Sequence, residues 1–416
     1  MAEQHGKALV PQIRFAGFTD PWEQRKLGEV ARRVTRKNEN RDSDLPLTIS
    51  AQYGLVDQRT FFNNQVASKD MSGYFLLRKG EFAYNKSTST DSPWGAIKRL
   101  EKYDMGCVST LYICFELLSG DPDFLVTYYE TDRWYKAVQL IAAEGARNHG
   151  LLNIAPDDFF ETQICIPKRI DEQRQIGAFF DRLDSLITLH QRKYDKLCVL
   201  KKSMLDKMFP KGGSLYPEIR FAGFTDPWEQ RRLGEVATFG GGHTPSMSDS
   251  DNYEGGNVLW VTSQDVKSHY LDGTTTQITE KGAKELTLYP AGSLVMVTRS
   301  GILRHTLPVA ELRKPSTVNQ DIRVILPQEN YYGQWLLQFF ISRNKELLLE
   351  FGKTGTTVES VDFSKMRDMV LLTPSLPEQQ QIGRYFARLD NLITLHQRKL
   401  ELLRNIKKSM LDKMFV

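Results

Sequence analysis

The sequence predicts an α+β protein made of two similar halves, and three observations support this prediction. Blocks of sequence near the start of the chain recur 206 residues later. Each half ends in a long segment whose apolar residues have the spacing of a coiled coil. The stretches between the repeated blocks place strand-like runs before a helical run. We therefore expect two domains of mixed strand and helix, joined by two long helices.

Two pairs of blocks define the repeat. Residues 11–31 and 217–237, called the frame segments below, match at 19 of 21 positions. Residues 172–210 and 378–416 match at 27 of 39 positions, with the same offset of 206. Because the repeating unit is some 200 residues long and occurs twice, the chain is not a short-repeat solenoid.

The blocks at 172–210 and 378–416 predict the two long helices. In each block, apolar residues fall on two seven-residue series that lie four positions apart, the pattern of a coiled-coil seam. Pro167 precedes the first helix and Pro210 ends it. We expect the helices to pack through Ile176, Phe180, Leu183, Ile187, Leu197 and Met204 in the first block and Ile382, Phe386, Leu389, Ile393, Leu403 and Met410 in the second.

The two stretches between the blocks, 32–171 and 238–377, are each 140 residues long, and their interiors show no convincing alignment. Both nevertheless have the same order of predicted elements, which indicates one fold used twice. The predicted strands lie at 74–85, 108–117, 257–266, 292–301 and 321–327, and the predicted helices lie around 123–142 and 331–351.

These blocks and stretches give four predicted regions. We expect a first domain over 1–171, with variable part 32–171, and a second over 211–377, with variable part 238–377. The predicted helix at 172–210 lies between the two domains, and the predicted helix at 378–416 follows the second domain.

The composition is that of an ordinary globular protein, with 25% charged and 40% hydrophobic residues. It argues against disordered, collagen-like and disulfide-scaffold proteins. The sequence contains no stretch of 18 apolar residues, so it predicts no transmembrane helix. The N-terminus lacks the apolar core of a signal peptide. Four scattered cysteines fit free thiols in a reducing compartment. We expect a cytoplasmic protein that does not bind a membrane.

No catalytic or metal-binding motif stands out. The string GKTGTT at 352–357 lacks the spacing of a phosphate-binding P-loop. The Gly-rich run at 240–246 lacks the dinucleotide-binding fingerprint and is by itself a weak signal of such a site. His190 and His396 occupy matching seam positions, where a metal pair is one interpretation and a polar pair that sets the helix register is the expected one. The sequence therefore predicts a protein with no catalytic residues, no metal site and no cofactor of its own.

Basic and amide side chains gather on several predicted loops of both variable parts. Arg and Asn or Gln suit hydrogen bonding to base edges, whereas Lys, Ser and Thr suit phosphate. With a net charge of only +4, any polyanion has to be bound by such local patches. The candidate DNA-binding residues are Arg32, Arg33, Arg36, Asn85, Lys86, Arg147, Asn148, His243, Thr244, Arg299, Ser300, Arg304, Asn319, Gln320, Lys353 and Thr354.

With these motifs, the chain resembles the specificity subunits of type I restriction–modification enzymes. The resemblance rests on IRFAGFTDPWEQRKLGEV at 13–30 and its near-copy, on RLD-x-LITLHQRK in both helices, and on KKSMLDKMF at the end of each. Shorter matches lie at the edges of the variable parts, such as TRSGIL at 298–303 and TVNQDI at 317–322. The resemblance covers essentially the whole chain.

The resemblance implies a fold and a function. The variable parts would be two target-recognition domains, and the helices would be conserved spacers packed as an antiparallel coiled coil, with pseudo-two-fold symmetry overall. Each domain would read one half of an asymmetric bipartite site in double-stranded DNA. The chain would assemble with two modification subunits and two restriction subunits, which would carry S-adenosylmethionine, ATP and Mg.

Two other classes of function compete with this interpretation. A self-contained nuclease or methyltransferase would need motifs that are missing here, and methylation by the purified chain alone would support it. A coiled-coil adaptor that never reads DNA would show no sequence-dependent binding when its partners are present. Because the repeated blocks are near-identical, we also hypothesise that recombination between them exchanges recognition domains, which rearranged alleles within one culture would reveal.

The spacer helices are expected to act as a ruler between the two half-sites. A helix over 172–206 is roughly 50 Å long at ~1.5 Å per residue, and half-sites one turn of DNA apart are separated by about 34–36 Å. Inserting or deleting whole heptads within 176–204 should therefore change the length of the unread gap in the target. An unchanged gap in the mapped target would show that these helices do not set the distance.

Overall fold

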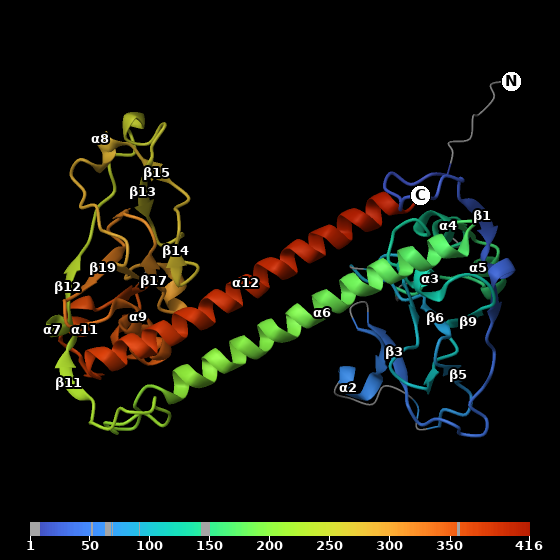
Figure 1. Ribbon diagram of the computed structural model, residues 1–416, viewed down its shortest axis with the longest axis horizontal. Helices are drawn as coiled ribbons and strands as arrows, with labels where there is room; N and C mark the ends of the chain where they lie inside the picture. Colours follow the sequence, from blue (N-terminus) through green and yellow to red (C-terminus); the bar gives the residue numbers. More distant parts are fainter. Residues whose placement is uncertain are drawn as a thin grey trace. The chain divides into compact units, whose positions relative to one another are not determined.

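The computed structural model describes residues 9–50, 53–62, 68, 70–90, 92–142, 150–355 and 358–416. The chain forms two compact units, shown in Figure 1. Unit 1 comprises Met1–His190 and Arg398–Val416, and unit 2 comprises Gln191–Gln397. Each unit thus contains one of the two variable parts together with portions of both repeated helical blocks.

The two long helices predicted from the heptad pattern are present as α6 (Ile170–Lys207) and α12 (Leu376–Met414). Their predicted packing positions are divided between the two units. Six are buried, namely Ile176, Phe180, Leu183, Ile382, Phe386 and Leu389. Four are partly buried against a core, namely Leu197, Met204, Leu403 and Met410. Ile187 and Ile393 are half-exposed.

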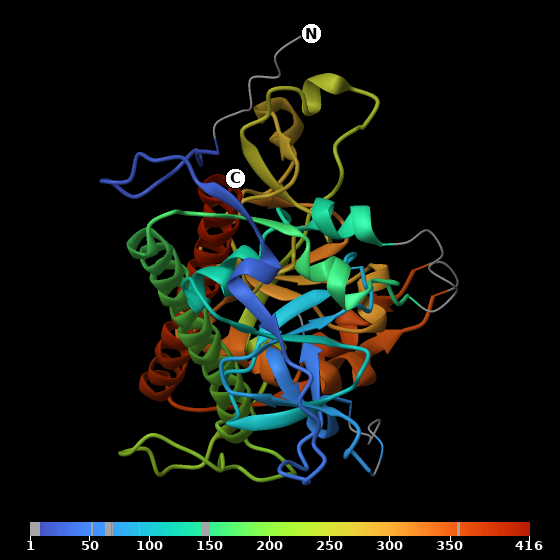
Figure 2. The same cartoon turned by 90° about the vertical axis from the view of Figure 1, so that its right-hand side faces the viewer.

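Unit 1 is built around an antiparallel sheet of four strands, whose blue-to-cyan strands are in front in Figure 2. In spatial order these strands are β2 (Ala31–Arg33), β9 (Ile113–Leu117), β6 (Phe82–Asn85) and β7 (Ala96–Arg99). Two-stranded pairs are formed by β1 (Glu23–Lys26) with β10 (Gln163–Ile166), β3 (Leu47–Ser50) with β4 (Gly54–Asp57), and β5 (Phe75–Arg78) with β8 (Met105–Val108). The short helices are α1 (Leu27–Val30), α2 (Gln58–Phe62), α3 (Pro122–Tyr128), α4 (Tyr135–Ile141) and α5 (Pro156–Phe160).

Unit 2 contains a five-stranded sheet with the order β12 (Ala237–Gly240), β19 (Ile322–Pro327), β16 (Leu294–Val297), β17 (Val309–Leu312) and β14 (Tyr270–Leu271). A three-stranded sheet has the order β15 (Gln277–Ile278), β13 (Val258–Val261) and β18 (Thr317–Val318). Two pairs are β11 (Glu229–Arg232) with β22 (Val370–Thr373) and β20 (Gly352–Lys353) with β21 (Ser360–Val361). The helices are α7 (Leu233–Val236), η1 (Ser250–Asn252), α8 (Glu280–Ala283), η2 (Gly301–Arg304), α9 (Gly333–Ser342), α10 (Asn344–Phe351) and α11 (Phe363–Asp368).

The main sheets of the two units have the same topology. The order β2-β9-β6-β7 in unit 1 corresponds to β12-β19-β16-β17 in unit 2, and all these neighbours are antiparallel. Unit 2 adds β14 at the edge, parallel to β17. The expectation that two dissimilar sequences share one fold is therefore confirmed for the main sheets.

Several predicted elements are shorter than the patterns indicated. The run at 74–85 is two strands in different sheets, because Gly80 adopts φ 92° and turns the chain between them. The helical runs at 123–142 and 331–351 are each two helices. Apolar periodicity continues through such breaks because both pieces bury a face against the same core, so the pattern alone did not show the breaks.

Each unit closes its core with the end of a long helix. In unit 1, Phe415 just past the end of α12 is 3% exposed and contacts Trp22 of the first frame segment, with ring centroids 5.9 Å apart. In unit 2, Phe209 just past the end of α6 contacts Trp228 of the second frame segment at 6.0 Å. The repeated blocks therefore form the same packing arrangement in both units.

A buried ion pair joins each frame segment to the start of a long helix. Arg14 donates two hydrogen bonds to Glu172 in the first turn of α6, at 2.6 and 2.7 Å. Arg220 makes the same two bonds to Glu378 of α12, at 2.7 and 2.8 Å. Both carboxylate side chains are only 1% exposed, so bidentate pairing is what compensates their loss of hydration.

Phe415→Ala should destabilise unit 1 by about 3 kcal/mol, because it leaves a cavity among buried aromatic rings. Leu402→Ala is the matched control, since Leu402 lies in α12, the helix that leads to Phe415, and is 59% exposed; its effect should stay below about 0.5 kcal/mol. Hydrogen exchange of buried unit 1 amides under increasing denaturant measures both. Equal effects of the two substitutions would contradict this role of Phe415.

Candidate nucleic-acid interface

Four of the predicted loops in unit 2 lie together in the structure. We define the loop face as residues 241–246, 298–305, 318–321, 352–355 and 358–361. The hydroxyl of Thr244 donates to the side-chain carbonyl of Gln320 at 2.7 Å. The backbone N–H of Ser300 donates to the carbonyl of Glu359 at 3.0 Å, and that of Thr298 donates to Asp321 at 2.8 Å. Candidate residues from distant parts of the sequence thus share one surface.

The Gly-rich run at 240–246 is explained by close backbone packing. The hydroxyl of Tyr289 accepts from the N–H of Gly241 and donates to its carbonyl, both at 2.8 Å. A Cβ atom on Gly242 would lie 1.8 Å from the carbonyl oxygen of Val318, and one on Gly240 would lie 2.2 Å from the Tyr289 hydroxyl. These glycines allow the loop at 241–246 to lie against its neighbours.

Two of the three candidate cations on the loop face are paired with carboxylates. Arg304 pairs with Glu359, and Lys353 pairs with Asp362 at 2.8 Å. These cations hold the pKa values of the Glu359 and Asp362 carboxyls below their usual range. Arg299 is exposed and makes no ion pair with any residue that the structure describes.

The remaining candidates of unit 2 differ in exposure. His243, Gln320 and Thr354 are exposed. Asn319 is buried, and its amide donates to the carboxylate of Asp321 at 3.3 Å. Asn319 therefore shapes the loop, whereas the exposed side chains can reach a ligand.

Arg323 is an exposed cation beside the loop face that the sequence reasoning missed. It lies in β19 between two buried residues, Ile322 and Val324. A Cβ atom on Gly241 would lie 2.8 Å from a guanidinium nitrogen of Arg323, which places this cation against the glycine loop. The alternation of apolar and polar residues in this strand was the signal that could have identified it.

In unit 1, the three candidate arginines that the structure describes lie beside carboxylates. The pairs are Arg32 with Glu116, Arg33 with Asp157 and Arg36 with Glu81, with nearest N···O distances of 2.5, 3.9 and 2.9 Å. Arg36 also donates to the carbonyl of Leu76 at 3.1 Å. The Glu81 side chain is 9% exposed, so Arg36 stabilises the domain in addition to any contact it makes with a ligand.

Asn85 ends strand β6 of unit 1, and Lys86 follows it. The amide oxygen of Asn85 accepts from the N–H of Ser87 at 3.0 Å, which shapes the following turn. The ammonium of Lys86 donates to the carbonyl of Ile154 at 3.2 Å, and burial lowers the pKa of this lysine. Arg147 and Asn148 lie outside the described residues.

Other chemistry is limited among the described residues. Within them, no group of three or more His, Cys, Asp or Glu side chains is arranged to hold a metal ion. Burial raises the pKa of the Cys107 and Cys165 thiols to about 11, so little of the nucleophilic thiolate forms near neutral pH. No helix in the described part of the chain is long and apolar enough to span a membrane.

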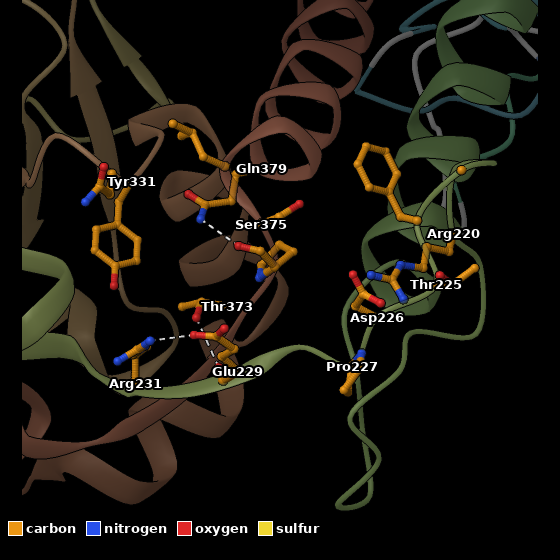
Figure 3. A pocket seen from close by; sticks show the side chains of 15 residues that line it. Arg220, Thr225, Asp226, Pro227, Glu229, Arg231, Tyr331, Thr373, Ser375 and Gln379 are labelled. Carbon is orange, nitrogen blue, oxygen red and sulfur yellow. Dashed lines mark hydrogen bonds and ion pairs between the residues drawn. The ribbon is translucent and has the colours of Figure 1, made fainter.

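The cavity in Figure 3 has a volume of about 420 Å³ and lies in unit 2 between the second frame segment and the start of α12. Its polar groups bond to one another. Glu229 pairs with Arg231, and its backbone carbonyl accepts from the hydroxyl of Thr373 at 3.0 Å. The amide of Gln379 donates to the carbonyl of Pro374 at 2.8 Å. The Thr373 bond holds strand β22 against the frame segment, and the Gln379 bond joins the first turn of α12 to Pro374, just before the helix.

Comparisons with known proteins identify the second half of the chain. Residues 225–405, which include the whole loop face, match the family model described as the type I restriction modification DNA specificity domain. The EcoR124I/EcoR124II specificity subunit of Escherichia coli is 32% identical over 166 residues, which cover 39% of this chain and 41% of that protein. The MjaIX specificity subunit of Methanocaldococcus jannaschii is 27% identical over 194 residues, covering 45% and 44%.

The chain spans less than half the length of these two curated relatives. Among solved structures, the S subunit of a type I restriction-modification system from M. genitalium aligns with a TM-score of 0.58 at 15% identity. That alignment covers 98% of this chain and 99% of the other, and shows a shared fold. The predicted resemblance to type I specificity subunits is therefore confirmed, with residues 225–405 matching the model of the type I restriction modification DNA specificity domain.

Proposed function

We propose that this chain is the specificity subunit of a type I restriction–modification system, which reads double-stranded DNA through one recognition domain in each unit and catalyses no reaction itself. One observation carries the proposal. The loop face, where exposed cations and amides from four distant segments meet, lies within the residues that match the DNA specificity family. Such side chains suit base edges and phosphates.

The target is expected to be asymmetric and split into two parts. The main sheets have the same strand order in both units, but the loops that follow the strands differ in sequence and in contacts. In unit 2 the candidates form the loop face, whereas in unit 1 the candidate arginines Arg32 and Arg36 pair with carboxylates. Two similar domains with different surfaces would read two different half-sites.

The spacer helices would form an antiparallel coiled coil that relates the two halves by a pseudo-two-fold axis. Two contacts support this arrangement. In unit 1, Asp184 of α6 pairs with Lys407 of α12. In unit 2, Lys201 of α6 pairs with Asp390 of α12. Each residue of one pair is the repeat equivalent of a residue in the other, with the two helices exchanged.

The partners follow from the same resemblance. Two modification subunits would bring S-adenosylmethionine, and two restriction subunits would bring ATP and Mg, with the whole assembly in the cytoplasm. The exposed residues Thr19 to Pro21 recur unchanged as Thr225 to Pro227, and both copies are exposed. Two identical surfaces suit two copies of the same partner.

Co-expression of this chain with its modification subunit in a methylation-free host tests the proposal. Single-molecule sequencing should map methyladenine to a split, asymmetric motif with a fixed gap. Replacing residues 32–171 with the variable part of a related chain should alter one half of the motif and leave the other unchanged. A soluble complex that methylates no DNA would contradict the proposal and favour either an adaptor that never reads DNA or a decayed system.

Arg299→Ala should weaken DNA binding by the assembled complex. If Arg299 contacts a phosphate, the slope of log affinity against log salt concentration should fall by about 0.9, because one fewer counterion is released. Lys345→Ala is the control, since Lys345 is an exposed cation of α10 outside the loop face. Salt titrations of both variants measure the difference. Equal slopes and equal affinities for Arg299→Ala and the unsubstituted chain would remove Arg299 from the interface.

A further inference from the structure

Each unit contains an ion pair between the two long helices. In unit 1, the ammonium of Lys407 lies 2.6 and 2.8 Å from the two carboxylate oxygens of Asp184. In unit 2, the ammonium of Lys201 lies 2.5 Å from the carboxylate of Asp390. The two lysine side chains are only 18% and 11% exposed, so both cations depend on these partners in place of water.

In unit 1, the variable part adds a second carboxylate to this pair. Glu130 follows α3, and one of its oxygens lies 2.7 Å from the ammonium of Lys407. Its other oxygen accepts from Lys98 of strand β7 at 3.3 Å. Burial alone would raise the pKa of Glu130, but the two lysines lower it below its usual value. A chain of alternating charges thus connects α6, α12 and the main sheet.

In unit 2, the variable part approaches the other member of the pair. The hydroxyl of Tyr270, in strand β14, donates to the carboxylate of Asp390 at 3.0 Å. The same hydroxyl lies 3.3 Å from the amide oxygen of Gln334, whose amide nitrogen bonds to Glu311 of strand β17. The helix pair is again connected to the main sheet, here through a hydroxyl and an amide.

The two connections end on equivalent strands but use unrelated side chains. Strands β7 and β17 hold the same position in the shared strand order. The lysine and aspartate come from the repeated blocks, whereas Glu130 and Tyr270 come from the variable parts. One domain meets the cation with a carboxylate, and the other meets the anion with a hydroxyl. The same Lys–Asp pair on the helices is therefore contacted by a different side chain in each unit.

We propose that the Lys–Asp pair is a common docking point on the spacer helices, and that each recognition domain is positioned on it by its own polar group, Glu130 in unit 1 and Tyr270 in unit 2. The inference rests on the proposed function in treating the variable parts as recognition domains. Glu130 and Tyr270 are positioning residues in this scheme, because they set how the domain sits on the helices without contacting DNA.

Reversing the polarity of the pair in unit 1 separates domain docking from helix pairing. The double variant D184K/K407E keeps opposite charges on the two helices but places a carboxylate against Glu130. Amide exchange in residues 122–132 should accelerate about tenfold in the full chain, because like charges would then share a poorly hydrated site. Adding E130K together with K98E should return the exchange rate to within about twofold of the starting value, because Lys98 also contacts Glu130 and reversing both residues restores the alternation of charge along the chain of groups.

The matched control is the same reversal in unit 2, K201E/D390K. A hydroxyl both donates and accepts hydrogen bonds, so Tyr270 is able to accept from the new lysine. Exchange in residues 270–271 should therefore change by less than about threefold. The single variant Glu130→Gln keeps the shape of the side chain and provides a milder test if the double variant fails to fold; it should accelerate exchange in 122–132 by about threefold.

Two results would overturn the inference. One is a D184K/K407E chain that exchanges like the unsubstituted chain, which would mean that Glu130 does not depend on the identity of its helix partner. The other is an accelerated chain that E130K with K98E fails to restore, with Glu130→Gln also without effect. These measurements use the isolated chain without DNA, so a failure of the methylation test would leave them interpretable and would count against the proposed function alone.

Discussion

The core of each unit depends on burying the end of a long helix. Each of these helices begins among residues that belong to the other unit. Phe415 closes the core of unit 1 against Trp22, and Phe209 closes that of unit 2 against Trp228. A small sheet with short helices leaves an apolar face that it cannot cover itself, and burying an aromatic ring contributes about 1.5–3 kcal/mol. The repeated blocks are therefore parts of the two cores as well as connections.

This constraint explains where the sequence repeats and where it varies. The frame segment has to present a Trp to the helix end and an Arg to a buried Glu in both units, and these positions are identical in the two copies. The interiors of the variable parts have only to preserve strand order and an apolar side facing the core. Many sequences satisfy that weaker condition, so two dissimilar stretches of 140 residues form the same main sheet.

The sequence was sufficient to predict those structural features that produce a periodic pattern or a repeat. The heptad pattern identified α6 and α12, because each apolar residue is one of a regular series, and most of those residues are buried or partly buried in the cores of the units. Contacts between isolated side chains had no such signal. Arg36 meets Glu81 across 45 residues, and Lys407 meets Asp184 across 223. Arg36 thus looked like a free cation, and the gathering of four loops into one face was visible only in the structure.

The charges of the loop face set limits on how such a protein would bind DNA. Glu359 and Asp362 neutralise Arg304 and Lys353, so Arg299 and the neighbouring Arg323 carry most of the uncompensated positive charge among the described residues there. Few free cations release few counterions, which keeps sequence-independent affinity low. If the chain reads DNA as proposed, one domain alone binds weakly, and useful affinity requires both domains to engage one duplex, where the second contact forms at a high effective concentration. Under the proposed function, the modest charge of the loop face would then favour recognition of a split target.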